Sequence, residues 1–252
     1  MPLSLRNLLH DTAAMFRPTF NGLAAVVMLY VVFALLVFPH SNVLSGDLPD
    51  TDDYMYLDQI MDWLNGQGWY DNIQHRMDPP AGVPIHFSRL AMMPMAALVW
   101  IFERCGLPPV GAGTIMAMIY PLILMGLFFA ALRWVVKNFV PTEWAGASAF
   151  VVLFLPGTLF MFRPGHIDHH GLMALMLMVA MGCVLRLMDN PDDKRWPVYA
   201  GLLMAFGQVI ALEILPWLLL LSGWIGLWAI MQGKPAARQG LIYGIVLALR
   251  MM

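Results

Sequence analysis

The sequence predicts an all-α protein that crosses a membrane several times. Of its 252 residues, 60% are hydrophobic and only 12% are charged, whereas about 25% are charged in an ordinary soluble domain. Several long stretches contain no charged residue, and a helix needs about 20 apolar residues to cross a bilayer. A net charge of −2 gives no basic surface for nucleic acid. We expect one membrane domain over 1–252, with six to seven membrane helices and no soluble C-terminal domain.

Apolar stretches locate the expected spans, and they are uncharged apart from Arg186 and Glu213 near the ends of two of them. They are 20–39, 110–132, 144–162, 170–187, 197–213 and 216–232. The apolar run from Gln239 is too short to cross unaided. Residues 90–102 are also uncharged, but as a helix they would cover only about 20 Å. We therefore expect an interfacial helix over 90–104, following a large outer loop at 40–89.

Basic residues set the expected orientation. Arg6 and Arg17 precede the first span, which is typical of a signal anchor with a cytoplasmic N-terminus. If 90–104 does not cross, most other basic residues also fall inside, as the positive-inside rule requires. They are Arg133, Lys137, Arg186, Lys194, Arg195, Lys234 and Arg238. The 40–89 loop, a second outer loop at 163–170 and Glu213 then share the outer side of what we expect to be a bacterial inner (plasma) membrane.

The first outer loop is acidic and holds half of the chain's 16 acidic residues. Its segment DTDDYMYL, at 50–57, places three aspartates within four residues, just before a helix-like stretch. Aspartate at a helix start caps free amide groups, which explains one of the three more readily than all of them. Asp52 is therefore a candidate metal ligand.

The second outer loop, RPGHIDHHGL at 163–172, gathers five titratable groups at the start of an apolar helix. A helix cap with interfacial histidines is one reading. The other is a functional site, because unpaired polar groups near hydrocarbon are costly and tend to mark function. Asp168 and His170 are two residues apart and can point at one ion. Together with Asp52 they offer two carboxylates and one imidazole, a set that suits Mg²⁺ or Mn²⁺ better than zinc.

This pattern resembles the catalytic subunits of oligosaccharyltransferases, in the GT-C class of membrane glycosyltransferases. DDYMY at 52–56 is similar to the family's D-x-Y-x-[HY]-like motif. PPAGVPIHF at 79–87 is similar to its Pro/Gly-rich turn before a membrane-hugging helix, and DHH at 168–170 to its archaeal second-loop motif. Only the family's N-terminal part is covered. Its further helices, outer-loop Glu and C-terminal domain with a W-W-D-Y-G-like motif have no counterpart, so we expect a truncated relative of doubtful activity.

The resemblance implies a metal-dependent transfer of a sugar or oligosaccharide from a polyprenyl-phosphate-type lipid donor on the outer membrane face. The acceptor, whether protein, lipid or polysaccharide, stays open. Asp52 would also be catalytic by activating the acceptor. Arg163 and His166 could contact donor phosphate, although Arg163 could equally be an interfacial anchor.

Two further residues and two alternative functions remain. His169 is expected to face water or backbone. Glu213 is a further candidate at the outer end between two spans, with a solvated loop charge as the favoured alternative. A transporter fragment is an alternative function because intramembrane charge can mark an ion path, and a non-catalytic membrane scaffold is another.

Overall fold

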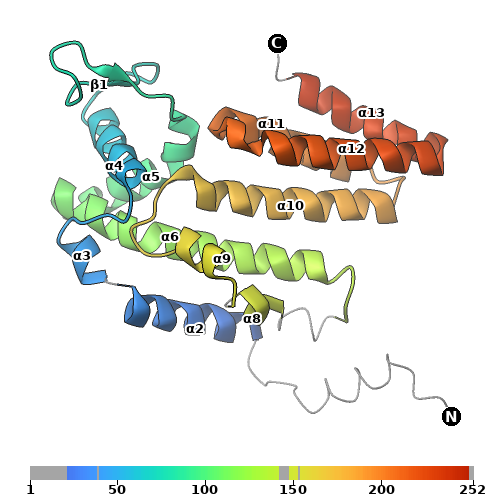
Figure 1. The fold of residues 1–252 in the computed structure, drawn as a ribbon, viewed down its shortest axis with the longest axis horizontal. Coiled ribbons are helices and arrows are strands. Elements are labelled where there is room, and N and C mark those ends of the chain that lie inside the picture. Colours follow the sequence, from blue (N-terminus) through green and yellow to red (C-terminus); the bar gives the residue numbers. More distant parts are fainter. Residues whose placement is uncertain (1–21, 39, 142–147, 153, 250–252) are drawn as a thin grey trace.

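The computed structural model describes residues 22–38, 40–141, 148–152 and 154–249, and these are mostly helical (Figure 1). The signal-anchor prediction rests on Arg6 and Arg17, and both residues lie outside the described residues. The elements are α2 (Gly22–Val37), α3 (His40–Leu44), α4 (Thr51–Leu64), β1 (Ile73–Gln74), β2 (Val83–Pro84), α5 (Arg89–Arg104), α6 (Pro109–Val136), α8 (Ser148–Val152), α9 (Pro156–Met161), α10 (His169–Asp189), α11 (Arg195–Ile210), the 3-10 turn η1 (Leu212–Ile214), α12 (Leu215–Gln232) and α13 (Lys234–Ala248).

Three helical segments in the described part of the chain are long and apolar enough to cross a bilayer. They are Pro109–Val136, His169–Asp189 and Leu212–Gln232. They correspond to the predicted spans 110–132, 170–187 and 216–232, which are thus confirmed as helices of membrane length. The protein is accordingly an integral membrane protein. The predicted number of six to seven spans is not confirmed, because only these three helices reach membrane length among the described residues.

The predicted span 144–162 is not a continuous helix. Two short helices, α8 and α9, occupy 148–152 and 156–161, and residues 142–147 and 153 lie outside the described residues. Pro156 begins α9, and Leu155 before it is extended. A proline has no amide hydrogen to donate and disfavours helical geometry in the residue before it, so the chain breaks there despite its apolar composition.

The predicted span 197–213 is also shorter than expected. Helix α11 ends at Ile210, and η1 separates it from α12. Its 16 residues cover about 24 Å, less than the ~30 Å hydrocarbon core. The interfacial-helix prediction at 90–104 coincides with α5, which packs against α4 and α6; its position relative to a membrane remains a prediction.

The long helices lie side by side, with α10 packed between α6 and α11, and α13 packed against α11 and α12 (Figure 1). The buried core runs along these contacts and includes many of the methionines, such as Met92, Met116 and Met204. Helix α10 runs through the bundle from His169 at one end to Asp189 at the other, and the two ends of the bundle carry different kinds of residue.

One end of the bundle, hereafter the basic end, is formed by the C-terminal ends of α6 and α10 and the start of α11. There Arg186 of α10 donates to the Trp134 carbonyl of α6 at 2.8 Å, and its guanidinium lies 3.5 Å from the Trp134 ring centre. Lys194 and Arg195 begin α11 at the same end. The opposite end, hereafter the site end, carries α4, the β1–β2 hairpin and the first turn of α10 (Figure 1).

The first loop is an ordered structure at the site end. Arg76, beside the hairpin, makes a two-point ion pair with Asp62 of α4, at 3.0 and 2.8 Å. Arg89, only 4% exposed, donates to the carbonyls of Gln59 and Asp71 at 2.8 and 2.6 Å. Because a guanidinium presents several donors in a rigid fork, these two arginines hold the hairpin, α4 and α5 together.

Candidate functional site

The site starts with the first turn of α4. Asp50 is the N-cap residue, and its carboxylate accepts a hydrogen bond from the Asp52 amide at 3.2 Å. The capping interpretation of this motif is thus correct for one of the three aspartates. Capping fixes where the helix begins, and so sends Asp53 and Tyr56 to its buried face, while Asp52 is left half-buried beside a cleft.

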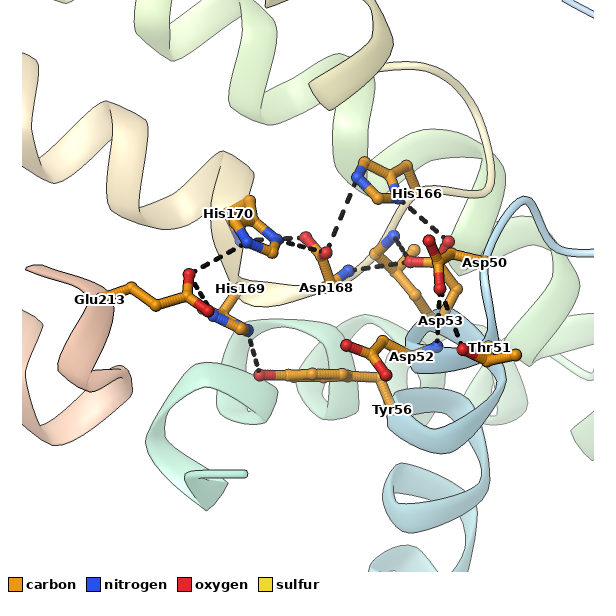
Figure 2. Close-up of polar contacts among 11 residues, drawn as sticks. Asp50, Thr51, Asp52, Asp53, Tyr56, His166, Asp168, His169, His170 and Glu213 are labelled. Carbon is orange, nitrogen blue, oxygen red and sulfur yellow. Dashed lines mark hydrogen bonds and ion pairs between the residues drawn. The ribbon is translucent and has the colours of Figure 1, made fainter. Parts of the chain in front are cut away.

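Asp53 joins the two loops. Its side chain is fully buried, and its Oδ1 accepts hydrogen bonds from the backbone amides of Ile167 and Asp168 at 2.7 and 3.1 Å. Its Oδ2 lies 3.0 Å from His166 Nδ1. One carboxylate therefore satisfies two buried amides and a ring nitrogen of the second loop, and places that loop against the start of α4 (Figure 2).

A glycine lets the second loop make this approach. Gly165 has a φ of +90°, a conformation that residues with a side chain rarely adopt. A Cβ atom at this position would lie 2.8 Å from Pro49 and 2.9 Å from Val43. The Gly165 amide donates to the Ala117 carbonyl of α6 at 2.9 Å. The turn before Asp168 is therefore packed between the first loop and α6.

Asp168 is the centre of a chain of polar contacts. It is the N-cap of α10, with Oδ1 accepting from the His170 amide at 2.9 Å. Its Oδ2 lies 2.5 Å from His170 Nδ1 and 3.7 Å from His166 Nε2. Burial raises the pKa of the Asp168 carboxyl, but the hydrogen bond from His170 and the charges of His166 and His170 outweigh it, so that the pKa lies below its ordinary value of 3.8.

His166 responds to the same carboxylates. Burial lowers the pKa of its imidazole, yet the hydrogen bond to Asp53 and the charges of Asp168 and Asp53 exceed that effect and raise the pKa above its ordinary value of 6.5. The neighbouring Arg163 acts in the opposite, lowering direction. The cationic form of His166 is therefore favoured by the two aspartates that flank it.

The structure corrects the prediction for His169, which is buried against side chains and does not face water. Its Nδ1 lies 3.1 Å from the Tyr56 hydroxyl, and its Nε2 lies 3.4 Å from Glu213 Oε2. Only 6% of the residue is exposed. Glu213 also reaches His170 Nε2, at 3.1 Å, although its own side chain is 57% exposed. Glu213 is thus both solvent-accessible and part of the histidine cluster (Figure 2).

The remaining predicted residues line one open cleft of about 500 Å³. Its polar wall contains the five residues singled out in the two loops. They are Asp52, Arg163, His166, Asp168 and His170. Within the described residues, no hydrogen bond or ion pair to another side chain holds the Asp52 carboxylate. The cleft therefore presents an unengaged carboxylate opposite a histidine–aspartate cluster.

The wall of the cleft formed by α9 is apolar, with Gly157, Phe160 and Met161 along it. Phe160 is 52% exposed. The Arg163 guanidinium lies 5.4 Å from the Phe160 ring centre, at the boundary between the two walls. Both alternatives for Arg163, an anchor at the interface and a phosphate contact, are compatible with this position.

The spacing of possible metal ligands refines the predicted set. In the described ranges, two groups of three side chains bring ligand atoms within 4.8 Å of one another: His166, Asp168 and His170, and His169, His170 and Glu213. Asp52 belongs to neither group, although it shares the cleft with Asp168 and His170. The structure therefore brings Asp168 and His170 together directly, and Asp52 to the same cleft only.

Sequence reasoning missed Asp53 and Tyr56 as site residues. A signal for both was available, because buried residues recur on one face of a helix at spacings of three and four, and Asp53, Tyr56 and Ile60 follow that spacing. Asp53 lies on this face, and Asp52 does not. The pairing of His169 with Glu213, which are far apart in the chain, had no comparable local signal.

Neither protein-family models nor curated proteins match this chain. Its function is therefore inferred from the motifs, from the contacts between the two loops and from the make-up of the cleft.

Proposed function

We propose that the chain is a metal-dependent glycosyltransferase of the oligosaccharyltransferase type. It would move a sugar or oligosaccharide from a polyprenyl-phosphate-type donor to an acceptor on the outer membrane face. One observation carries the proposal: the buried Asp53 carboxylate fastens the second loop to α4, so that residues from two distant segments line a single cleft.

The donor set of the cleft fits a divalent ion. Asp52, Asp168 and His170 would hold Mg²⁺ or Mn²⁺, and the ion would neutralise charge on the departing phosphate. The ligand atoms of Asp168 and His170 already lie close enough for one ion, and no other side chain among the described residues holds the Asp52 carboxylate. Because imidazole is a poor ligand for Mg²⁺, Mn²⁺ suits the set better.

The chain's own side chains would bind both ends of an amphiphilic donor. The Arg163 guanidinium presents paired N–H donors that match phosphate oxygens, and cationic His166 would add a second positive charge beside it. The apolar α9 wall would contact the polyprenyl chain. Asp52 would accept the proton of the attacking acceptor group, because a carboxylate within hydrogen-bond reach can act as general base.

The distribution of charge supports an outer location for the cleft. Arg186, Lys194 and Arg195 lie at the basic end, opposite the cleft. Cytoplasmic segments are enriched in Lys and Arg, so this arrangement favours a basic end in the cytoplasm and a site end outside. A bacterial inner (plasma) membrane remains part of the proposal.

The transporter alternative has less support. Charged groups that serve an ion path are expected along the interior of the spans, whereas the cluster here gathers at one end of α10 (Figure 2). A non-catalytic scaffold would tolerate substitutions in the cleft, and this difference separates it from the enzyme.

The test combines Mn²⁺ affinity with turnover of a polyprenyl-linked sugar by the full chain in detergent or nanodiscs. We expect Asp52→Asn and Asp168→Ala each to weaken Mn²⁺ binding and to abolish transfer. Asp58→Asn is the matched control, because Asp58 lies on the same helix but pairs with Arg76 outside the cleft. If both cleft variants bind Mn²⁺ like the wild type, the proposed metal-dependent mechanism is wrong.

A further inference from the structure

The ring nitrogens of two adjacent histidines converge on one carboxylate oxygen. His170 Nε2 lies 3.1 Å and His169 Nε2 lies 3.4 Å from Glu213 Oε2, and the three ligand atoms all lie within 4.8 Å of one another. The Nε2 atom of His169 is buried and has no hydrogen-bond partner within the described part of the chain. Buried polar atoms in proteins are nearly always hydrogen-bonded, so a buried ring nitrogen without such a bond calls for an explanation, and a metal ion bound between the ring and the carboxylate is one.

The other nitrogen of each ring is held in place. His170 Nδ1 lies 2.5 Å from Asp168 Oδ2, and His169 Nδ1 lies 3.1 Å from the Tyr56 hydroxyl. An ionised Asp168 carboxylate cannot donate, so this contact requires the proton on His170 Nδ1 and leaves Nε2 as the ring nitrogen that could bind an ion. A carboxylate or other partner on the far nitrogen is the usual arrangement around a metal-binding histidine.

The residues that support the two rings are themselves closely packed. Tyr56 is fully buried and its ring stacks on Phe87 with centres 4.6 Å apart. The rings of His169 and His170 stack on each other at 4.5 Å. Neither histidine needs to change its ring contacts to present Nε2 toward Glu213. Because Glu213 is exposed, an ion could enter from the solvent side of the cluster.

The chemistry of this set differs from that of the cleft. Two imidazoles and one glutamate are the ligands of the His₂Glu zinc sites, in which a fourth position stays open to water or substrate. We infer that His169, His170 and Glu213 form a binding site for a zinc-like transition-metal ion. His170 belongs to both sets, and its Nδ1 cannot donate to Asp168 and bind an ion in the cleft at the same time, so the two ions would compete for this ring. The inference does not depend on glycosyl transfer.

The experiment measures Co²⁺ and Zn²⁺ binding to the full chain in detergent, with the visible absorption of bound Co²⁺ as the readout. Loss of a group that only orients a metal ligand lowers metal affinity by about 10- to 100-fold. Glu213→Gln and His169→Gln remove ligands themselves, so we expect each to lower the affinity for Co²⁺ and Zn²⁺ by at least as much. Tyr56→Phe, which removes only the hydroxyl beside His169, should fall within that range. His75→Gln is the matched control, since His75 is exposed in the hairpin region and should leave the affinity unchanged.

Variants of the cleft separate this site from the proposed one. Asp52→Asn should retain Co²⁺ and Zn²⁺ affinity while losing Mn²⁺ affinity. Equal Co²⁺ affinity in Glu213→Gln and the wild type would overturn the inference. Loss of Co²⁺ in Asp52→Asn, with Glu213→Gln unaffected, would also overturn it and would place the ion in the cleft. Failure of sugar transfer with intact Co²⁺ binding would instead count against the proposed function alone.

Discussion

Replacing Asp53 by alanine tests whether one carboxylate holds the two loops together. The substitution removes the acceptor of two buried backbone amides, at 2.7 and 3.1 Å, and the partner of His166. A hydrogen bond to a charged group contributes about 1.5–3 kcal/mol. Two such bonds predict a loss of about 3–6 kcal/mol in the free energy of unfolding. Asp53→Asn keeps a neutral acceptor, so its loss should be about half as large.

The assay is equilibrium unfolding of the full chain in mixed micelles, followed by circular dichroism. Asp58→Ala is the control on the same helix. Its carboxylate is 49% exposed and pairs with Arg76 at 3.4 Å, and exposed pairs of this kind contribute at most about 1 kcal/mol. A loss in Asp53→Ala no larger than in Asp58→Ala would refute the idea that this carboxylate fastens the second loop.

Two more predictions follow from the structure. In metal-free protein, stability should be greatest at mildly acidic pH. Because the pKa of Asp168 is lowered in the folded protein, Asp168 contributes to the free energy of unfolding above about pH 3.8, and this contribution is lost as pH falls through the folded-state pKa. Because the pKa of His166 is raised, its contribution is full below about pH 6.5 and is lost as pH rises through the folded-state pKa. The free energy of unfolding measured across this pH range checks both limits. Gly182→Ala should destabilise by about 1–3 kcal/mol, because its Cβ would lie 2.0 Å from the Trp134 ring, whereas Gly126→Ala, with nothing within 4 Å, should be neutral or stabilising by up to about 1 kcal/mol in the same unfolding assay.

Composition predicted the long helices because nothing interrupts their apolar runs. Helices α6, α10 and α12 coincide closely with the predicted spans. The interval 144–162 was mispredicted because hydropathy does not register helix geometry: its residues are apolar enough to cross, but Pro156 starts a new helix and leaves Leu155 extended. Such a break is a backbone effect, and a count of apolar residues cannot include it.

The sequence predicted which residues line the site better than it predicted which of them contact one another. The sequence singled out Asp52, Asp168 and His170 from two distant loops, and all three line one cleft; that they bind one ion stays a prediction. Asp52 was chosen over Asp53 as the site residue because of its place in the DDYMY motif. That choice did not consider which face of the helix is buried. His169 could not be assigned from local sequence, because its partners Tyr56 and Glu213 come from segments that only the tertiary fold brings together.

The cleft has one wall of charged side chains and one wall of exposed α9 side chains such as Phe160. Under the proposed function, the molecule that fills it has a charged head and an apolar tail, and it would arrive by diffusing sideways within the bilayer. Its supply is then set by the number of molecules per unit area of membrane. Saturation of this protein would follow the mole fraction of donor in the lipid, and dilution of the surrounding buffer would leave it unchanged.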